Sequence, residues 1–127
     1  MDDHHSEDLR GRRLLLVEDE YMIAADLAQT LEAYGVEVVG PAGSVEDALR
    51  LIDAGEPIDA AVLDINLRGE RVYPVAEALG EKAVPFVFAT GYDAWAIPPA
   101  YAQAPRCEKP VDVAVLARLL AGGMPAR

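Results

Sequence analysis

Short apolar runs and longer amphipathic segments alternate along this chain. Apolar runs of the kind found in strands buried on both faces occur at 14–17, 36–39, 60–63 and 84–89. Apolar residues at helical spacing predict helices over 21–34, 45–54 and 72–79, and a last helix over 113–120. This alternation predicts an α/β fold, a doubly wound five-stranded parallel sheet with helices on both faces.

The stretch between the fourth strand and the last helix breaks this rhythm. A helix is expected there, but it would have to pass Pro98, Pro99 and Pro105. Adjacent prolines stop a helix and push the preceding residue towards extended geometry. The fourth helix is therefore expected to be short, broken or replaced by a loop, before a weak fifth strand at 106–108.

Length and charge limit the classes of function. The 127 residues fit one domain, for which we expect a flexible acidic tail at 1–11, a folded domain over 12–122 and a C-terminal tail at 123–127. Twenty-two acidic residues against eleven basic ones argue against nucleic acid or an anionic membrane as partner. No apolar run approaches the roughly 20 residues that span a bilayer. A single cysteine, Cys107, permits a reducing compartment, so we expect a cytoplasmic protein.

Polar side chains follow the predicted strands at the point where each strand ends. Glu18 and Asp19 follow the first strand, Asp64 the third, Thr90 the fourth and Lys109 the fifth. Ligands of open parallel sheets bind beyond the carboxyl ends of the strands. Taken singly, each residue has a simpler explanation, such as a solvated loop acid, a cap or a turn residue. Four strand ends that deliver such groups to one edge favour a functional site.

The acidic members of this set suggest a metal ion. Three neighbouring carboxylates repel one another unless a cation lies among them. Mg²⁺ prefers one or two carboxylates together with water. We therefore expect Mg²⁺ to be bound by Asp19 and Asp64, with Glu18 nearby or acting through water and the backbone carbonyl of Asn66 completing the site.

The remaining two groups suit a phosphoryl group beside that metal ion. The ammonium of Lys109 would neutralise one phosphoryl oxygen, and the hydroxyl of Thr90 would donate a hydrogen bond to another. A carboxylate can form an aspartyl phosphate. Asp64 is thus the candidate nucleophile.

These residues resemble the motifs of response-regulator receiver domains, the CheY-like domains of two-component signalling. The resemblance extends from about residue 13 to 121 and rests on four segments: LVEDE at 16–20, LDINL at 63–67, FATG at 88–91 and EKP at 108–110. It implies the strand order 2-1-3-4-5. It also implies that Asp64 accepts a phosphoryl group from a phosphohistidine on a sensor histidine kinase.

The resemblance further assigns roles to the other residues. It implies Mg²⁺ at Glu18, Asp19, Asp64 and the Asn66 carbonyl. It also implies that Thr90 and Lys109 contact the phosphoryl group, and that the peptide bond before Pro110 is cis.

A closer likeness concerns residues 85–92, which read PFVFATGY. This segment is similar to the PFxFATGY signature of the FATGUY subgroup, mostly stand-alone receivers paired with HWE-type or related histidine kinases. For such a chain, output is expected through a downstream protein partner or phosphotransferase, or as a phosphate sink.

Two positions depart from the receiver pattern. Arg68 stands where many receivers have a proline, and Arg106 stands where a Tyr or Phe usually rotates on activation. The switch residues are therefore expected among Thr90, Tyr92 and Arg106, with Trp95 as another aromatic that could substitute.

Three other functions remain open from the sequence. A haloacid-dehalogenase-like phosphatase also uses a strand-end Asp with Mg²⁺, but it requires a second Asp where this chain has Asn66. A flavodoxin-like module needs a phosphate-cradling loop, whereas the loop at 18–20 is entirely acidic and would repel the phosphate of FMN. A receiver-like binding module could also act by contact alone, without phosphorylation.

Overall fold

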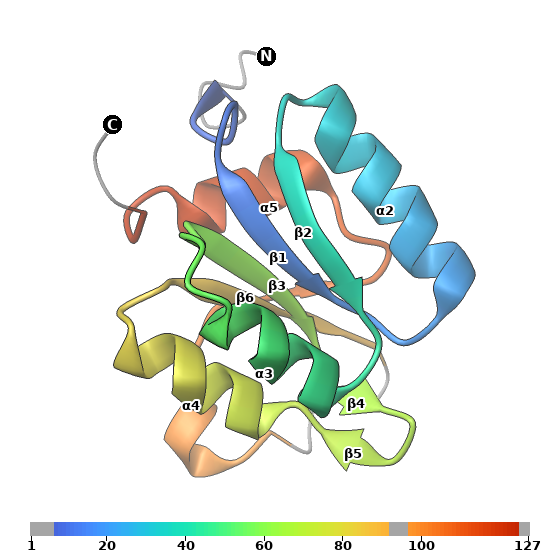
Figure 1. Cartoon of the computed structure of the whole chain (residues 1–127), viewed down its shortest axis with the longest axis vertical. Coiled ribbons are helices and arrows are strands. Elements are labelled where there is room, and N and C mark those ends of the chain that lie inside the picture. The colour runs from blue at the N-terminus through green and yellow to red at the C-terminus, as the bar shows by residue number, and fades with distance from the viewer. Residues whose placement is uncertain (1–6, 92–96, 125–127) are drawn as a thin grey trace.

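The five-stranded parallel sheet has the order β2-β1-β3-β6-β7, which is the predicted order once the two short strands β4 and β5 are counted (Figure 1). The computed structural model describes residues 7–91 and 97–124. The strands are β1 (Arg13–Val17), β2 (Glu37–Ala42), β3 (Ala60–Asp64), β4 (Asn66–Leu67), β5 (Glu70–Arg71), β6 (Phe86–Thr90) and β7 (Arg106–Glu108). The helices are α2 (Tyr21–Ala33), α3 (Val45–Asp53), α4 (Tyr73–Glu81) and α5 (Val113–Leu120). The predicted α/β class and all five strands are confirmed.

Helices cover both faces of the sheet (Figure 1). On one face, α2 and α5 pack against alternate strand residues such as Leu16, Val62 and Val87. On the other face, α3 and α4 pack against the residues in between, such as Leu15 and Phe88. Because successive strand side chains point to opposite faces, strands covered on both sides must be apolar throughout. This is why the strands read as continuous apolar runs in the sequence.

Two of the helices, α3 and α5, begin at a residue whose side chain satisfies a free backbone amide. The hydroxyl of Ser44 accepts a hydrogen bond from the Asp47 amide at the start of α3 (3.1 Å). The carboxylate of Asp112 accepts one from the Ala114 amide at the start of α5 (2.9 Å). After α2, Gly35 adopts a left-handed backbone (φ 86°), which costs glycine little. None of the helices in the described ranges has the length and apolar character needed to cross a membrane.

Three local features differ from the sequence predictions. Strand β2 does not close at Gly40 but continues to Ala42 through an irregular register, because Gly40 (φ 101°) can approach the β1 backbone where a Cβ would not fit. A hairpin of β4 and β5, which the pattern did not predict, follows Asp64. Of the tail expected at 1–11, residues 1–6 lie outside the described residues, and within 7–11 Leu9 is fully buried in the core cluster that it shares with residues of α2 and α5.

The connection between β6 and β7 contains no helix longer than a single 3-10 turn, η2 (Pro99–Tyr101), within its described residues 97–105. The ring of Tyr101 stacks on Tyr73 of α4 (centroids 5.2 Å apart) and meets Phe88 edge to face (5.8 Å). The prediction of a short or replaced fourth helix therefore holds where the connection is described. Aromatic packing anchors this segment in place of a helix.

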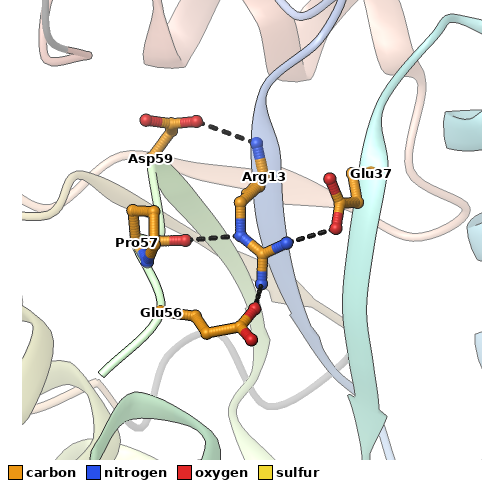
Figure 2. A network of polar contacts seen from close by, with 5 residues as sticks. All are labelled: Arg13, Glu37, Glu56, Pro57 and Asp59. Carbon is orange, nitrogen blue, oxygen red and sulfur yellow. Dashed lines mark hydrogen bonds and ion pairs between the residues drawn. The ribbon is translucent and has the colours of Figure 1, made fainter. Parts of the chain in front are cut away.

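Arg13 connects three segments at the amino-terminal edge of the sheet (Figure 2). Its guanidinium pairs with Glu37 of β2 and Glu56, and it donates a hydrogen bond to the Pro57 carbonyl (2.7 Å). Its backbone amide donates to the Asp59 carboxylate (2.8 Å). This network lies at the opposite end of β1 from Glu18, so it supports the sheet without entering the candidate site.

Candidate functional site

The strand-end residues singled out in the sequence lie at one edge of the sheet. Asp64 is the last residue of β3 and Thr90 the last residue of β6, while Glu18 and Lys109 directly follow β1 and β7. Glu18 and Lys109, which lie just beyond the strands, are held by backbone hydrogen bonds. The Glu18 amide donates to the Ala42 carbonyl, and the Lys109 amide donates to the Thr90 carbonyl (2.9 Å each). Regular strand pairing thus brings together groups that are far apart along the chain.

Three carboxylates converge at the centre of this edge. Glu18, Asp19 and Asp64 each offer an oxygen, and these oxygens lie within 4.8 Å of one another. Glu18 and Asp64 are 5% and 8% exposed, which is unusual for carboxylates. Glu18 is oriented by the Glu20 amide, which donates a hydrogen bond to its side chain (3.0 Å). Only a strong compensating charge makes such a cluster stable.

Lys109 provides part of that charge. Its Nζ lies 3.0 Å from Glu18 Oε1 and 3.1 Å from Asp64 Oδ1, so one ammonium is shared by two carboxylates. Burial, and then the charge of Glu18, raise the pKa of Asp64 to about 7 although Lys109 lowers it. Burial alone would lower the pKa of Lys109, but its contacts with Glu18 and Asp64 raise it above the usual value. The single positive charge of Lys109 therefore does not fully offset the negative charge of the carboxylates.

Thr90 is buried, and its hydroxyl has a partner on the neighbouring strand. Its hydroxyl donates a long hydrogen bond (3.4 Å) to the carbonyl of Cys107 on the adjacent strand β7. To reach a group attached to Asp64, the hydroxyl would have to exchange this partner. Tyr92 and Trp95, the other switch candidates near Thr90, lie outside the described residues.

Arg106, at the position of the usual aromatic switch, makes a polar contact with the backbone instead. Its guanidinium donates a hydrogen bond to the Ala102 carbonyl (2.8 Å), which ties β7 to the end of η2. The Lys109–Pro110 peptide bond is cis. Composition alone predicts neither the role of Arg106 nor the cis peptide bond at Pro110. Both positions were identified from their place in the receiver motifs.

The hairpin after Asp64 adds residues to the rim of the site. The side chain of Asn66 accepts a hydrogen bond from the Gly69 amide (3.2 Å), so its carboxamide holds the turn. Arg68 extends over Asp19, with Nε 3.7 Å from Oδ2 and Nη2 donating to the backbone carbonyl (3.4 Å). In the sequence, Arg68 is recognisable only as a departure from the receiver pattern. The signal that could reveal its place at the site is a cation four residues beyond a strand-end Asp.

The donor set fits a hard divalent cation. Carboxylate oxygens are the ligands that Mg²⁺ prefers, and the three here are close enough to share one ion. The residue two positions after Asp64 is Asn66, which holds a turn and supplies no acid for a dehalogenase-like phosphatase.

Comparisons with known proteins agree with this geometry. The solution structure of SdrG from Sphingomonas melonis Fr1 superposes with a TM-score of 0.73 at 43% identity, covering 87% of this chain and 93% of that one. A response regulator receiver protein from Sinorhizobium medicae WSM419 superposes with a TM-score of 0.71 at 27% identity, covering 87% and 92%. This chain belongs to the response-regulator receiver domains.

A further similarity concerns a longer regulator. The receiver is 33% identical over 82 residues to the transcriptional regulatory protein PdtaR of Mycobacterium tuberculosis, a match of 64% of this chain. The receiver spans only about 40% of the length of that relative. No family model matches the chain.

Proposed function

We propose that this receiver accepts a phosphoryl group on Asp64 from a phosphohistidine of a histidine kinase. The observation that carries the proposal is the buried Asp64 carboxylate, 3.1 Å from the ammonium of Lys109, in a cluster of three acids. In the transfer, the phosphorus–nitrogen bond breaks as an Asp64 oxygen bonds to phosphorus, and the departing imidazole keeps the electron pair and takes a proton from water.

In this proposal Glu18, Asp19 and Asp64, with the Asn66 carbonyl, hold Mg²⁺. When bound, the ion neutralises negative charge on the phosphoryl oxygens. Lys109 is already within ion-pair distance of Asp64 and would pair with a phosphoryl oxygen from the same position. The protein itself would hold the acceptor oxygen of Asp64, shield it in part from water and supply one positive charge through Lys109.

Thr90 provides the route from the phosphoryl group to the rest of the domain. Its hydroxyl would leave the Cys107 carbonyl, where the bond is long, and donate to a phosphoryl oxygen. Loss of that bond would loosen the contact between β6 and β7, next to the segment that Arg106 ties to Ala102. The switch in this receiver would thus act through 97–107 rather than through an aromatic side chain at 106.

A surface beside the site supports a protein phosphodonor. A groove of about 370 Å³ borders Glu18 and Lys109, and its apolar wall includes Ile23 and Leu27 of α2. At the start of α2, Tyr21 and Met22 are 80% and 77% exposed, and neighbouring exposed apolar side chains of this kind are typical of a protein interaction surface. We propose that a histidine kinase, of the HWE type or related, docks here in the cytoplasm. Output would pass to a protein partner, or the domain would serve as a phosphate sink.

Phosphotransfer from candidate kinases tests the proposal. Kinases carrying a ³²P-labelled phosphohistidine, mixed with this receiver and Mg²⁺, should label the wild type, and hydroxylamine should remove the label because acyl phosphates react with it. Asp64→Asn should remain unlabelled, while Asp53→Asn, an exposed carboxylate at the end of α3, should behave as the wild type. Labelling of Asp64→Asn, or a hydroxylamine-stable label, would contradict the assignment. Acetyl phosphate as donor separates acceptor chemistry from kinase recognition.

A further inference from the structure

Arg68 occupies a backbone position that does not favour arginine. It is the first of two turn residues between β4 and β5, and both Arg68 (φ 53°) and Gly69 (φ 91°) adopt left-handed conformations. Such a two-residue turn prefers Asn or Gly at its first position. Arginine is therefore present although this left-handed backbone disfavours it, and residues held in such conformations are often found at functional sites.

The turn is held firmly enough to aim this side chain. Leu67 is buried in the core, the Asn66 side chain accepts a hydrogen bond from the Gly69 amide, and the Val72 amide donates to the Ile65 carbonyl (2.9 Å). From this turn the guanidinium reaches back to Asp19, contacting both its carboxylate (3.7 Å) and its backbone carbonyl (3.4 Å). The Asp19 side chain is only 13% exposed, so Arg68, at 79%, lies on the outer side of the acidic cluster.

The charges of the site indicate what the contact between Arg68 and Asp19 can do. Glu18, Asp19 and Asp64, together with Lys109, carry two net negative charges when all are ionised, and a divalent cation cancels them. Phosphorylation replaces the single charge of Asp64 by the two charges of a phosphoryl group and leaves one negative charge in excess. The guanidinium of Arg68 supplies the missing positive charge.

We propose that Arg68 is a positioning and charge-balancing residue of the phosphoacceptor site, which opposes Mg²⁺ in the resting receiver and favours the phosphorylated one. It opposes the ion because it pairs with Asp19, a proposed ligand, and places a like charge beside it. It favours a phosphoryl group because it cancels the charge that the group adds. This inference rests on the proposed function, since it assumes both ligands at this site.

Two titrations distinguish this role from a purely structural one. The first measures the affinity of metal-free protein for Mg²⁺ alone by isothermal titration calorimetry. The second measures, in saturating Mg²⁺, the affinity for beryllofluoride, an anionic mimic of the phosphoryl group, from NMR spectra. For Arg68→Gln we expect Mg²⁺ to bind about two- to fivefold more tightly and beryllofluoride about two- to fivefold more weakly, the range of an exposed ion pair. Both effects should shrink as salt increases.

Matched variants separate the possible outcomes. Arg68→Lys should restore wild-type behaviour in part, and Arg118→Gln, which removes an exposed arginine from α5, should change neither affinity. If Arg68→Gln equals Arg118→Gln in both titrations, or shifts both affinities in the same direction, the inference is wrong while the proposed function stands. If the wild type binds neither Mg²⁺ nor beryllofluoride, the proposed function itself fails and the inference falls with it.

Discussion

Replacing Asp64 by asparagine changes the charge of the buried acid while nearly preserving its shape. In the metal-free receiver, burial and the neighbouring Glu18 raise the pKa of Asp64 from 3.8 to about 7. Between these two pH values the folded protein keeps a proton that the unfolded chain has released. The unfolded state therefore binds fewer protons, and folding stability falls as the pH rises from about 4 to about 7.

The size of this effect follows from the pKa values. Each unit of pKa difference corresponds to about 1.36 kcal/mol, and the interval from pH 5 to pH 8 includes about two of the three units, or about 2.7 kcal/mol. Water reaches the rim of the site, where Lys109 is 23% exposed, and screens part of this cost. We expect about 1–2 kcal/mol to remain. The asparagine side chain of the variant, being neutral at every pH, avoids this cost.

Urea unfolding in the presence of EDTA, which keeps the protein metal-free, tests this prediction. The free energy of unfolding of Asp64→Asn, relative to wild type, should increase by about 1–2 kcal/mol between pH 5 and pH 8. Taking the difference from wild type removes the pH dependence that the other titrating groups contribute to both proteins. The control Asp53→Asn should show no such trend. Excess Mg²⁺ should stabilise the wild type more than the variant. A difference between Asp64→Asn and wild type that stays constant or shrinks with pH would refute the reasoning from burial.

Three further changes test other parts of the site. Lys109→Ala removes the charge that lowers the pKa of Asp64, so the pKa of this acid in metal-free protein should rise above about 7; an NMR titration of its carboxyl carbon that shows an unchanged or lower value would contradict this. Met22→Glu should slow phosphotransfer from the cognate kinase about tenfold and leave labelling by acetyl phosphate unchanged, whereas equal slowing with both donors would exclude a docking role. Phe88→Ala empties a fully buried position among aromatic rings and should cost about 3–5 kcal/mol of stability in guanidinium unfolding; a loss below about 1 kcal/mol would mean that the cluster does not anchor η2.

The architecture was predictable because its signals are local. A strand covered on both faces has to be apolar throughout, so 14–17, 60–63 and 84–89 were recognisable without tertiary information. Parallel strands also place their carboxyl ends at one edge, so Glu18, Asp64 and Lys109 could be grouped from their positions along the chain. The sequence therefore determined the five-stranded sheet and the strand-end members of the candidate site.

The tertiary structure decided everything that depends on contacts between distant segments. Leu9 looked like part of a polar tail, and only the core into which it packs shows otherwise. The direction of the Thr90 hydroxyl depends on the Cys107 carbonyl, which lies on another strand. The placement of Arg68 over Asp19 depends on a left-handed turn that arginine does not favour. Periodicity records which side of an element is buried, but side-chain direction and pKa depend on neighbours that only the folded chain assembles.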